Sequence, residues 1–132
     1  MKPVVDAVEF LLDSGGLAKG HVDCQNLLHQ GMIEIQPLTY IRGRSISKRF
    51  VVIDEAQNLE PTTLKTILTR VGEGTKVVFT GDTSQIDAPY LSEHNNAVSV
   101  LIDAFEGERC FGHIRLAHCE RSEVASLAAM RL

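Results

Sequence analysis

The chain has 132 residues, of which 44% are hydrophobic and 23% charged, and its net charge is −4 at pH 7. This balance is typical of a single globular domain, which we expect to span residues 1–132, and it excludes an intrinsically disordered chain. The negative charge excludes a strongly basic nucleic-acid-binding protein, and no apolar run approaches the roughly 18 residues of a membrane span. The three scattered cysteines form no disulfide framework and the N-terminus has no secretory pattern, so we expect a cytoplasmic protein that does not contact a membrane.

The N-terminal third predicts two helices followed by a connector. Apolar residues recur at helical spacing over 3–12 and again over 21–30, where Gly31 is placed to end the second helix. A short strand is expected to begin at Ile33. The polar and basic segment 38–48 then leads into the rest of the chain.

Apolar runs and helical periodicities alternate through the remaining sequence. They predict strands over 49–53, 76–80 and 111–117, and helices from Pro61 to the glycines at 72 and 74, over 96–105 and over 123–131 after Ser122. This alternation predicts an α/β fold with a mostly parallel sheet, strands buried on both sides, and helices on both faces. Ligands bind at the carboxyl ends of strands in such sheets, so the functional residues should follow Ile53, Thr80 and Ala117.

Two carboxylates, Asp54 and Glu55, come directly after the strand over 49–53. The first can hold a Mg²⁺ ion through water, and the second can orient or deprotonate an attacking water. The alternative is an acidic cap for the helix that begins at Pro61, stabilised by the helix dipole.

The next strand ends in Gly81 and Asp82, and Gln85 follows three residues after the aspartate. A glutamine amide at this place can accept a hydrogen bond from water and donate one to a γ-phosphate oxygen, so it can report which nucleotide is bound. The alternative is a polar turn in which Asp82 bonds its own backbone.

Arginines supply the remaining candidates. Arg121, just before the last predicted helix, can complete a phosphate site in its own subunit or reach a neighbour's as an arginine finger. Pairing with a nearby surface glutamate is the alternative. Arg42 and Arg44, with Lys48 and Arg49, make four basic residues in eight, which suits contact with phosphates of nucleic acid or of a nucleotide on another subunit. A solvated basic loop is the competing interpretation.

A phosphate-cradling loop is the part that this sequence lacks. No G-x-x-x-x-G-K-[ST] motif occurs in the 132 residues. The segment GGLAKG at 15–20 has the wrong order of Gly and Lys, no Ser or Thr after the lysine and no strand before it. Without such a loop, Mg-ATP loses most of its binding energy.

The motifs together resemble a known family. The strand that ends in DEAQN at 54–58, the GDTSQ at 81–85 and the tail that contains HCERSE at 118–123 look like the C-terminal two-thirds of a PhoH-like (phosphate-starvation-inducible) ATPase. The likeness covers residues 3–132. It implies a partial RecA-like P-loop NTPase fold whose first strand, the phosphate-loop strand, is missing here, and a protein that binds and hydrolyses ATP with Mg²⁺ once the missing N-terminal segment is supplied.

Residue by residue, the resemblance makes Asp54 the ligand of the Mg²⁺-bound water and Glu55 the catalytic base of the Walker B motif. It makes Gln85, with Asp82, the γ-phosphate sensor, and it places Arg121 near the γ-phosphate. It further implies a link to RNA and a possible homo-oligomer. The fragment alone is expected to be inactive.

Two other functions stay open at the level of sequence. One is a non-catalytic RNA-binding or oligomerisation module that uses Arg42, Arg44 and Lys48. The other is a Mg²⁺-dependent nuclease built on Asp54, Glu55, Asp82 and Asp87. The missing strand would leave a gap beside the strand over 76–80, and we expect the strand over 111–117 to close it by direct pairing, unless a second copy does so.

Overall fold

A computed structural model describes residues 5–6, 24–41 and 43–116, together with Ser122, Val124, Leu127 and Arg131. The chain forms two compact units, Met1–Ser45 and Ile46–Leu132. Most of the helix expected over 3–12 lies outside the described residues, although Val5 and Asp6 are helical. The same holds for the helix expected over 123–131, in which Val124, Leu127 and Arg131 are helical.

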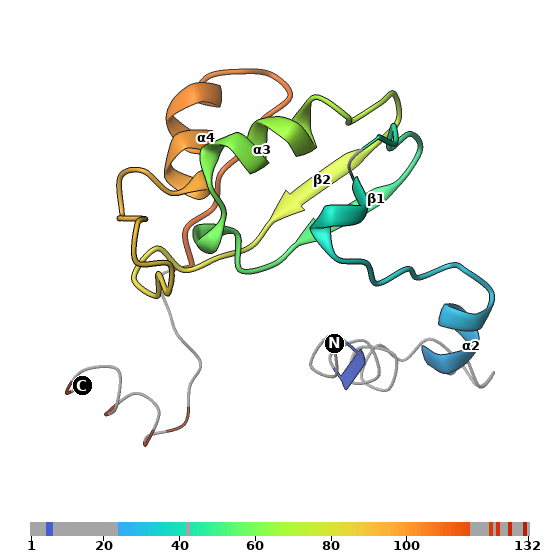
Figure 1. The fold of residues 1–132 in the computed structure, drawn as a ribbon, viewed down its shortest axis with the longest axis horizontal. Coiled ribbons are helices and arrows are strands. Elements are labelled where there is room, and N and C mark those ends of the chain that lie inside the picture. Colours follow the sequence, from blue (N-terminus) through green and yellow to red (C-terminus); the bar gives the residue numbers. More distant parts are fainter. Residues whose placement is uncertain are drawn as a thin grey trace. The chain divides into compact units, whose positions relative to one another are not determined.

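The first unit contains helix α2, Cys24–His29, which ends as the sequence predicts (Figure 1). Gly31 has a φ of 67°, and its N–H donates to Leu28 O at 3.1 Å while Met32 N–H donates to Leu27 O at 2.9 Å. These two bonds form the Schellman arrangement, which satisfies carbonyls left open at a helix end and favours glycine at the left-handed position.

The strand expected from Ile33 is absent, and this prediction was wrong. Residues 33–37 have no regular structure, and the 3₁₀ helix η1, Leu38–Ile41, follows directly. The described residues supply no partner strand here, and an extended segment without one leaves its N–H and C=O groups to water.

The second unit is built on two parallel strands, β1 (Phe50–Ile53) and β2 (Lys76–Phe79). They pair in the register Phe50 with Lys76 through Ile53 with Phe79. Figure 1 shows the two arrows side by side and pointing the same way. The structure thus confirms an α/β arrangement with a parallel sheet.

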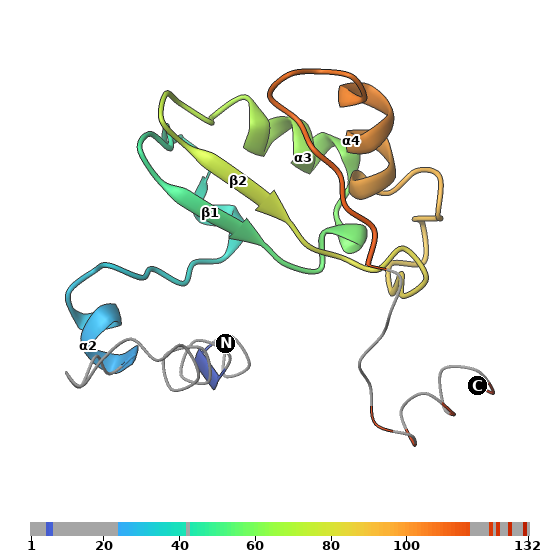
Figure 2. The same ribbon diagram turned by 180° about the vertical axis from the view of Figure 1, so that it is seen from behind.

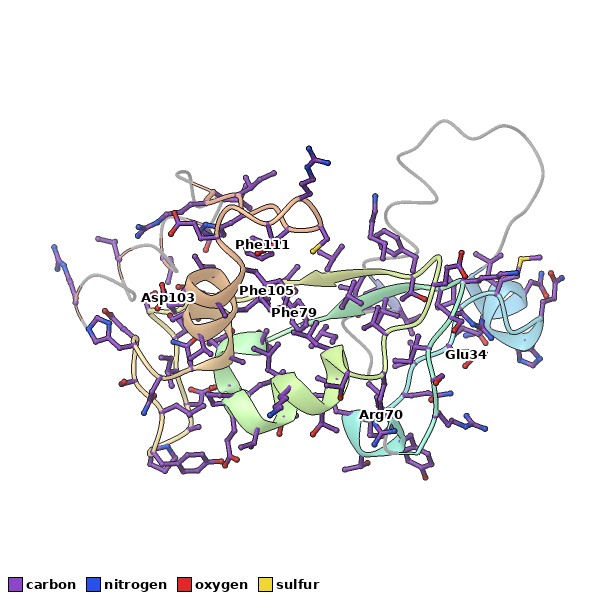
Figure 3. All side chains as sticks on the ribbon, turned by 90° about the horizontal axis from the view of Figure 1, so that it is seen from above. Glu34, Arg70, Phe79, Asp103, Phe105 and Phe111 are labelled. Atoms are coloured by element: carbon purple, nitrogen blue, oxygen red, sulfur yellow. The ribbon has the colours of Figure 1, made fainter. Side chains whose placement is uncertain are left out.

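Helices α3 (Pro61–Leu68) and α4 (Ala97–Phe105) lie on one face of this sheet. The hydrophobic core between these helices and the sheet consists of Leu64, Ala97 and Leu101. Several half-buried apolar side chains pack against it: Leu59, Leu68, Phe79, Phe105 and Phe111. Figure 3 shows Phe79, Phe105 and Phe111 gathered beside α4, and the rings of Phe105 and Phe111 lie 6.0 Å apart.

Both helices begin where the sequence predicts. Pro61 is the first residue of α3, where its missing N–H costs no hydrogen bond. Asn96 caps α4 by accepting from the N–H groups of Val98 and Ser99. The end of α3 comes earlier than expected, at Leu68, and the chain then tightens into a turn in which Arg70 N–H donates to Ile67 O and Val71 N–H donates to Leu68 O.

The other face of the sheet is open, which corrects the expectation of strands buried on both sides. Alternate residues of β1 point to this face, and Phe50 is 68% and Val52 57% exposed. Within the described part of the second unit, both helices cover the opposite face. Among the described residues, no helix combines the length and apolar character that crossing a membrane requires.

The third strand expected over 111–117 is also absent as far as it is described. Residues 111–116 carry no strand, and Ile114 and Leu116 are 84% and 85% exposed. Figure 2 shows this segment returning from the end of α4 toward the carboxyl end of β2. It does not pair with β2, whose one partner within the described residues is β1. Direct pairing therefore does not close the expected gap. Apolar composition alone was an insufficient basis for this strand, because a segment must also align with a neighbouring strand to complete its backbone hydrogen bonds.

Candidate nucleotide site at the carboxyl ends of the strands

The carboxyl ends of β1 and β2 are joined by backbone hydrogen bonds beyond the strands themselves. Thr80 N–H donates to Ile53 O at 2.9 Å, and Ala56 N–H donates to Thr80 O at 2.9 Å. The segment after β1 and the segment after β2 therefore leave the sheet at one edge, as parallel strands require. The acidic and amide candidates of the second unit, Asp54, Glu55, Asp82 and Gln85, all lie on these two segments.

Asp54 is the first residue beyond β1, and its side chain is exposed. Its Oδ1 accepts a hydrogen bond from the Thr80 hydroxyl at 2.7 Å and another from Glu55 N–H at 3.0 Å. Both donors reach the same oxygen, so the carboxylate is oriented by β2 as well as by its own strand. An oriented, exposed carboxylate at a strand end is a hard oxygen ligand of the kind that Mg²⁺ takes, so this residue fits the ion.

Glu55 has an unusual backbone conformation. Its φ of 54° and ψ of 37° lie in the left-handed region, which costs roughly 1–3 kcal/mol for a residue that is not glycine. Its carboxylate Oε2 accepts a hydrogen bond of 2.6 Å from Gln57 Nε2. Strain at this residue and a fixed carboxylate at the open edge are features that a positioned base would have.

Gln57 joins the two segments from inside the protein. Its side chain is fully buried in the short 3₁₀ helix η2, Ala56–Asn58. Besides its bond to Glu55, Nε2 donates to Gln85 O at 3.0 Å, and Oε1 accepts from Asp82 N–H at 3.2 Å. The next residue adds a third tie to the same loop, because Asn58 Oδ1 accepts from Asp87 N–H at 2.8 Å.

The loop after β2 is organised around Asp82. Its Oδ1 accepts from Ser84 N–H at 2.9 Å and from the Ser84 hydroxyl at 2.6 Å, and its Oδ2 accepts from Gln85 Nε2 at 2.6 Å. Asp82 thus bonds its own turn, as one of the two sequence interpretations expects, and it also fixes the amide plane of Gln85. The Gln85 side chain remains exposed at the same edge as Asp54 and Glu55.

The structure brings together four of the predicted site residues: Asp54, Glu55, Asp82 and Gln85. Arg42 and Arg121 lie outside the described residues. Arg44 belongs to the first unit, where it is exposed. Across the described ranges no group of three or more His, Cys, Asp or Glu side chains gathers as a metal cage, so the four carboxylates of the nuclease alternative do not form one cluster there.

Sequence reasoning missed the residues that hold this site in shape, namely Gln57, Asn58 and Thr80. The signal for Gln57 and Asn58 was present, because two amides directly follow an acidic pair at a strand end. Thr80 could have been found from its place as the last residue before the glycine of the second loop. A hydroxyl there reaches the residue at the end of a neighbouring parallel strand.

Sequence similarity to known proteins identifies the family of this chain. Residues 1–130 match the family described as PhoH-like protein. The chain belongs to the PhoH-like family. It is 46% identical over 129 residues to "Protein PhoH2" of Bacillus subtilis, a match that covers 98% of this chain. It is 41% identical over 132 residues to "Protein PhoH2" of Mycolicibacterium smegmatis, across 100% of this chain. A "PhoH-like protein" of Synechocystis is 50% identical over 77 residues, 58% of this chain and 24% of the relative.

These relatives are much longer than the region they share with this chain. The match covers 28% of the Bacillus subtilis protein and 29% of the Mycolicibacterium smegmatis protein. The resemblance seen in the sequence motifs is confirmed at the level of the family.

Proposed function

We propose that this PhoH-like chain carries the magnesium- and water-handling half of an ATP-hydrolysing site of the P-loop NTPase type. The observation that carries the proposal is the hydrogen-bonded edge at which Asp54, Glu55 and Gln85 meet. Two carboxylates and an amide, held by both strands, are the groups that phosphoryl transfer to water requires on the side of the nucleophile.

Each residue has a distinct task in this proposal. Asp54 would hold a Mg²⁺ ion through water, and the ion would supply positive charge against the phosphates of the nucleotide. Glu55 takes the proton of the attacking water as the water oxygen bonds to the γ-phosphorus and the bond to the ADP oxygen breaks. Gln85 presents its side-chain oxygen to that water, and the bond from its Nε2 to Asp82 Oδ2 fixes the amide plane.

The phosphate-cradling loop must come from outside these 132 residues, since the sequence contains no G-x-x-x-x-G-K-[ST] motif. The open face of the sheet at Phe50 and Val52, and the edge of β2 that pairs with no strand among the described residues, agree with a fold that has further strands and helices. We therefore expect Mg-ATP to bind weakly, if at all, to the isolated chain.

A chimera provides the test. This chain replaces the 129 matched residues of Bacillus subtilis PhoH2, and the intact relative is the reference for ATP hydrolysis. The chimera should hydrolyse ATP in a Mg²⁺-dependent manner. Glu55→Gln should retain Mg-ATP binding but lower turnover by about 10²- to 10⁴-fold, the usual contribution of a general base. If the relative hydrolyses ATP and the chimera does not, or if Glu55→Gln leaves turnover unchanged, the proposal fails.

The link to RNA rests on exposed basic residues, Arg44 in the first unit and Lys48 and Arg49 in the second. Adding single-stranded RNA to the same assay tests it. Stimulated hydrolysis supports an RNA-coupled ATPase. Salt-sensitive RNA binding with no ATP hydrolysis would instead favour the binding-module alternative.

A further inference from the structure

The proposed chemistry leaves one buried polar side chain without a task. Gln57 is fully buried, yet it lies between the two exposed groups that would handle the attacking water. Both hydrogens of its Nε2 are used, one on the Glu55 carboxylate at 2.6 Å and one on the Gln85 carbonyl at 3.0 Å. A buried amide with both donors committed is fixed in place.

The partners themselves determine which end of this amide is nitrogen. Turning the group over would set its oxygen against the Glu55 carboxylate and the Gln85 carbonyl, which are both acceptors. It would also set the NH₂ against the N–H of Asp82, which is a donor that Oε1 now accepts at 3.2 Å. Three contacts would become repulsive, so the orientation is unique.

We propose that Gln57 is a positioning residue that makes the base and the sensor loop one unit, an inference that rests on the proposed function above. Glu55 sits in a strained left-handed conformation, so its carboxylate depends on the Gln57 donor for its place. The same amide holds the sensor loop at Asp82 N–H and Gln85 O. A shift of that loop moves Gln57 and thereby the Glu55 carboxylate, which couples nucleotide sensing to the base.

The close approach of Gly81 supports this role. A Cβ built on Gly81 would lie 2.6 Å from Gln57 Oε1. The loop therefore passes against the amide with no room for a side chain, as a contact that transmits displacement requires.

Gln57→Glu tests the donor specifically. The substitution keeps an oxygen for Asp82 N–H but replaces both donors by an acceptor, so Glu55 and Gln85 O lose their bonds at nearly constant shape. The chain contains a matched control, because Gln36 Nε2 donates to Glu34 Oε2 at 3.0 Å on the exposed surface. Gln36→Glu creates the same pair of carboxylates at the same spacing, away from the strand ends.

The first measurement uses the 132-residue chain alone and needs no nucleotide. Gln57→Glu should lower the melting temperature by about 10 °C or more, because a buried acceptor then faces two others. Gln36→Glu should change it by no more than about 2 °C. Adding Glu55→Gln to Gln57→Glu exchanges donor and acceptor, and it should recover part of the loss. No recovery would show that the bond between the two side chains does not exist in solution.

The second measurement uses the active chimera. Gln57→Glu should lower kcat by about tenfold to a hundredfold, the cost of displacing a catalytic group by roughly 1 Å, and leave KM for Mg-ATP within about twofold. An unchanged kcat beside a lowered melting temperature would make Gln57 a merely structural residue and overturn the proposal. An inactive unsubstituted chimera would instead overturn the proposed function and the coupling with it, while the unfolding data would still decide whether the contact exists.

Discussion

Replacing Gly81 by alanine should destabilise the protein, chiefly because the added Cβ would collide with Gln57 Oε1. Gly81 is the first residue after Thr80, and its φ lies outside the left-handed region, so backbone conformation does not require glycine here. Space does. The added Cβ would lie 2.6 Å from Gln57 Oε1, 3.2 Å from Gln57 N and 3.4 Å from Ala56 N.

The size of this destabilisation depends on how far the Gln57 side chain can move away from the added Cβ. Reaching ordinary contact at 3.4 Å requires Gln57 Oε1 to withdraw by about 0.8 Å. A glutamine on the surface would do so freely, but this one is fully buried and holds three hydrogen bonds. Overpacking of this kind costs about 1–3 kcal/mol, and loss of the Asp82 N–H bond would cost a similar amount. We expect the free energy of unfolding to fall by about 2 kcal/mol, equivalent to a melting temperature lower by roughly 10 °C.

Thermal unfolding of two control series isolates the cause. Gly112→Ala meets nothing within 4 Å and should change the free energy by less than about 0.5 kcal/mol. In a Gln57→Ala background the obstructing oxygen is gone and only the milder 3.2 Å contact with the backbone N of residue 57 remains, so the further cost of Gly81→Ala should fall to about 1 kcal/mol or less. An equal cost of Gly81→Ala in both backgrounds would refute the steric explanation.

Two further substitutions address the cap of α4 and the orientation of Asp54. Asn96→Ala should lower the free energy of unfolding by about 2–3 kcal/mol in a urea titration, because the buried side chain accepts from two N–H groups of α4 and donates to the carbonyls of Ser92 and Glu93. A cost below about 0.5 kcal/mol would mean that water replaces these bonds. Thr80→Val removes the hydroxyl that orients Asp54, so the Mg²⁺ concentration for half-maximal hydrolysis by the chimera should rise severalfold, whereas Thr80→Ser should restore it. Equal Mg²⁺ dependence in both variants would show that Thr80 does not position this carboxylate.

Elements that a local sequence pattern specifies were predictable. The strands β1 and β2, the start of α3 at Pro61 and the Schellman end at Gly31 all follow from local patterns, and all are present. The strands expected at Ile33 and over 111–117 failed in the described residues for one reason. Apolar composition gives a segment the tendency to form a strand, but only a neighbour completes the hydrogen bonds that make one.

In the candidate site, too, some features could be predicted from the sequence and others could not. Acidic residues and Gln85 at strand ends could be found from their type and position, because open sheet edges collect polar groups. The residues that orient them also carry a signal in their type and place, but their contacts could not be assigned, since Gln57 and Thr80 bond to segments that are 25 or more residues away in the chain. A motif such as DEAQN names the first two residues by their chemistry, whereas the task of its glutamine appears only when the second loop is in place.

The site owes its shape more to side chains than to the sheet. Two strands alone form a marginal sheet in water, and here one face of that sheet is open at Phe50 and Val52. Nevertheless Asp54 is tied to Thr80, and Glu55 is tied through Gln57 to the loop of Gln85. These bonds join the two strand ends directly, so the arrangement of Asp54, Glu55 and Gln85 does not depend on a third strand. If the proposed function holds, a phosphate-binding segment that completes the site would meet a half that is already ordered, and little of its binding energy would go into arranging the proposed base.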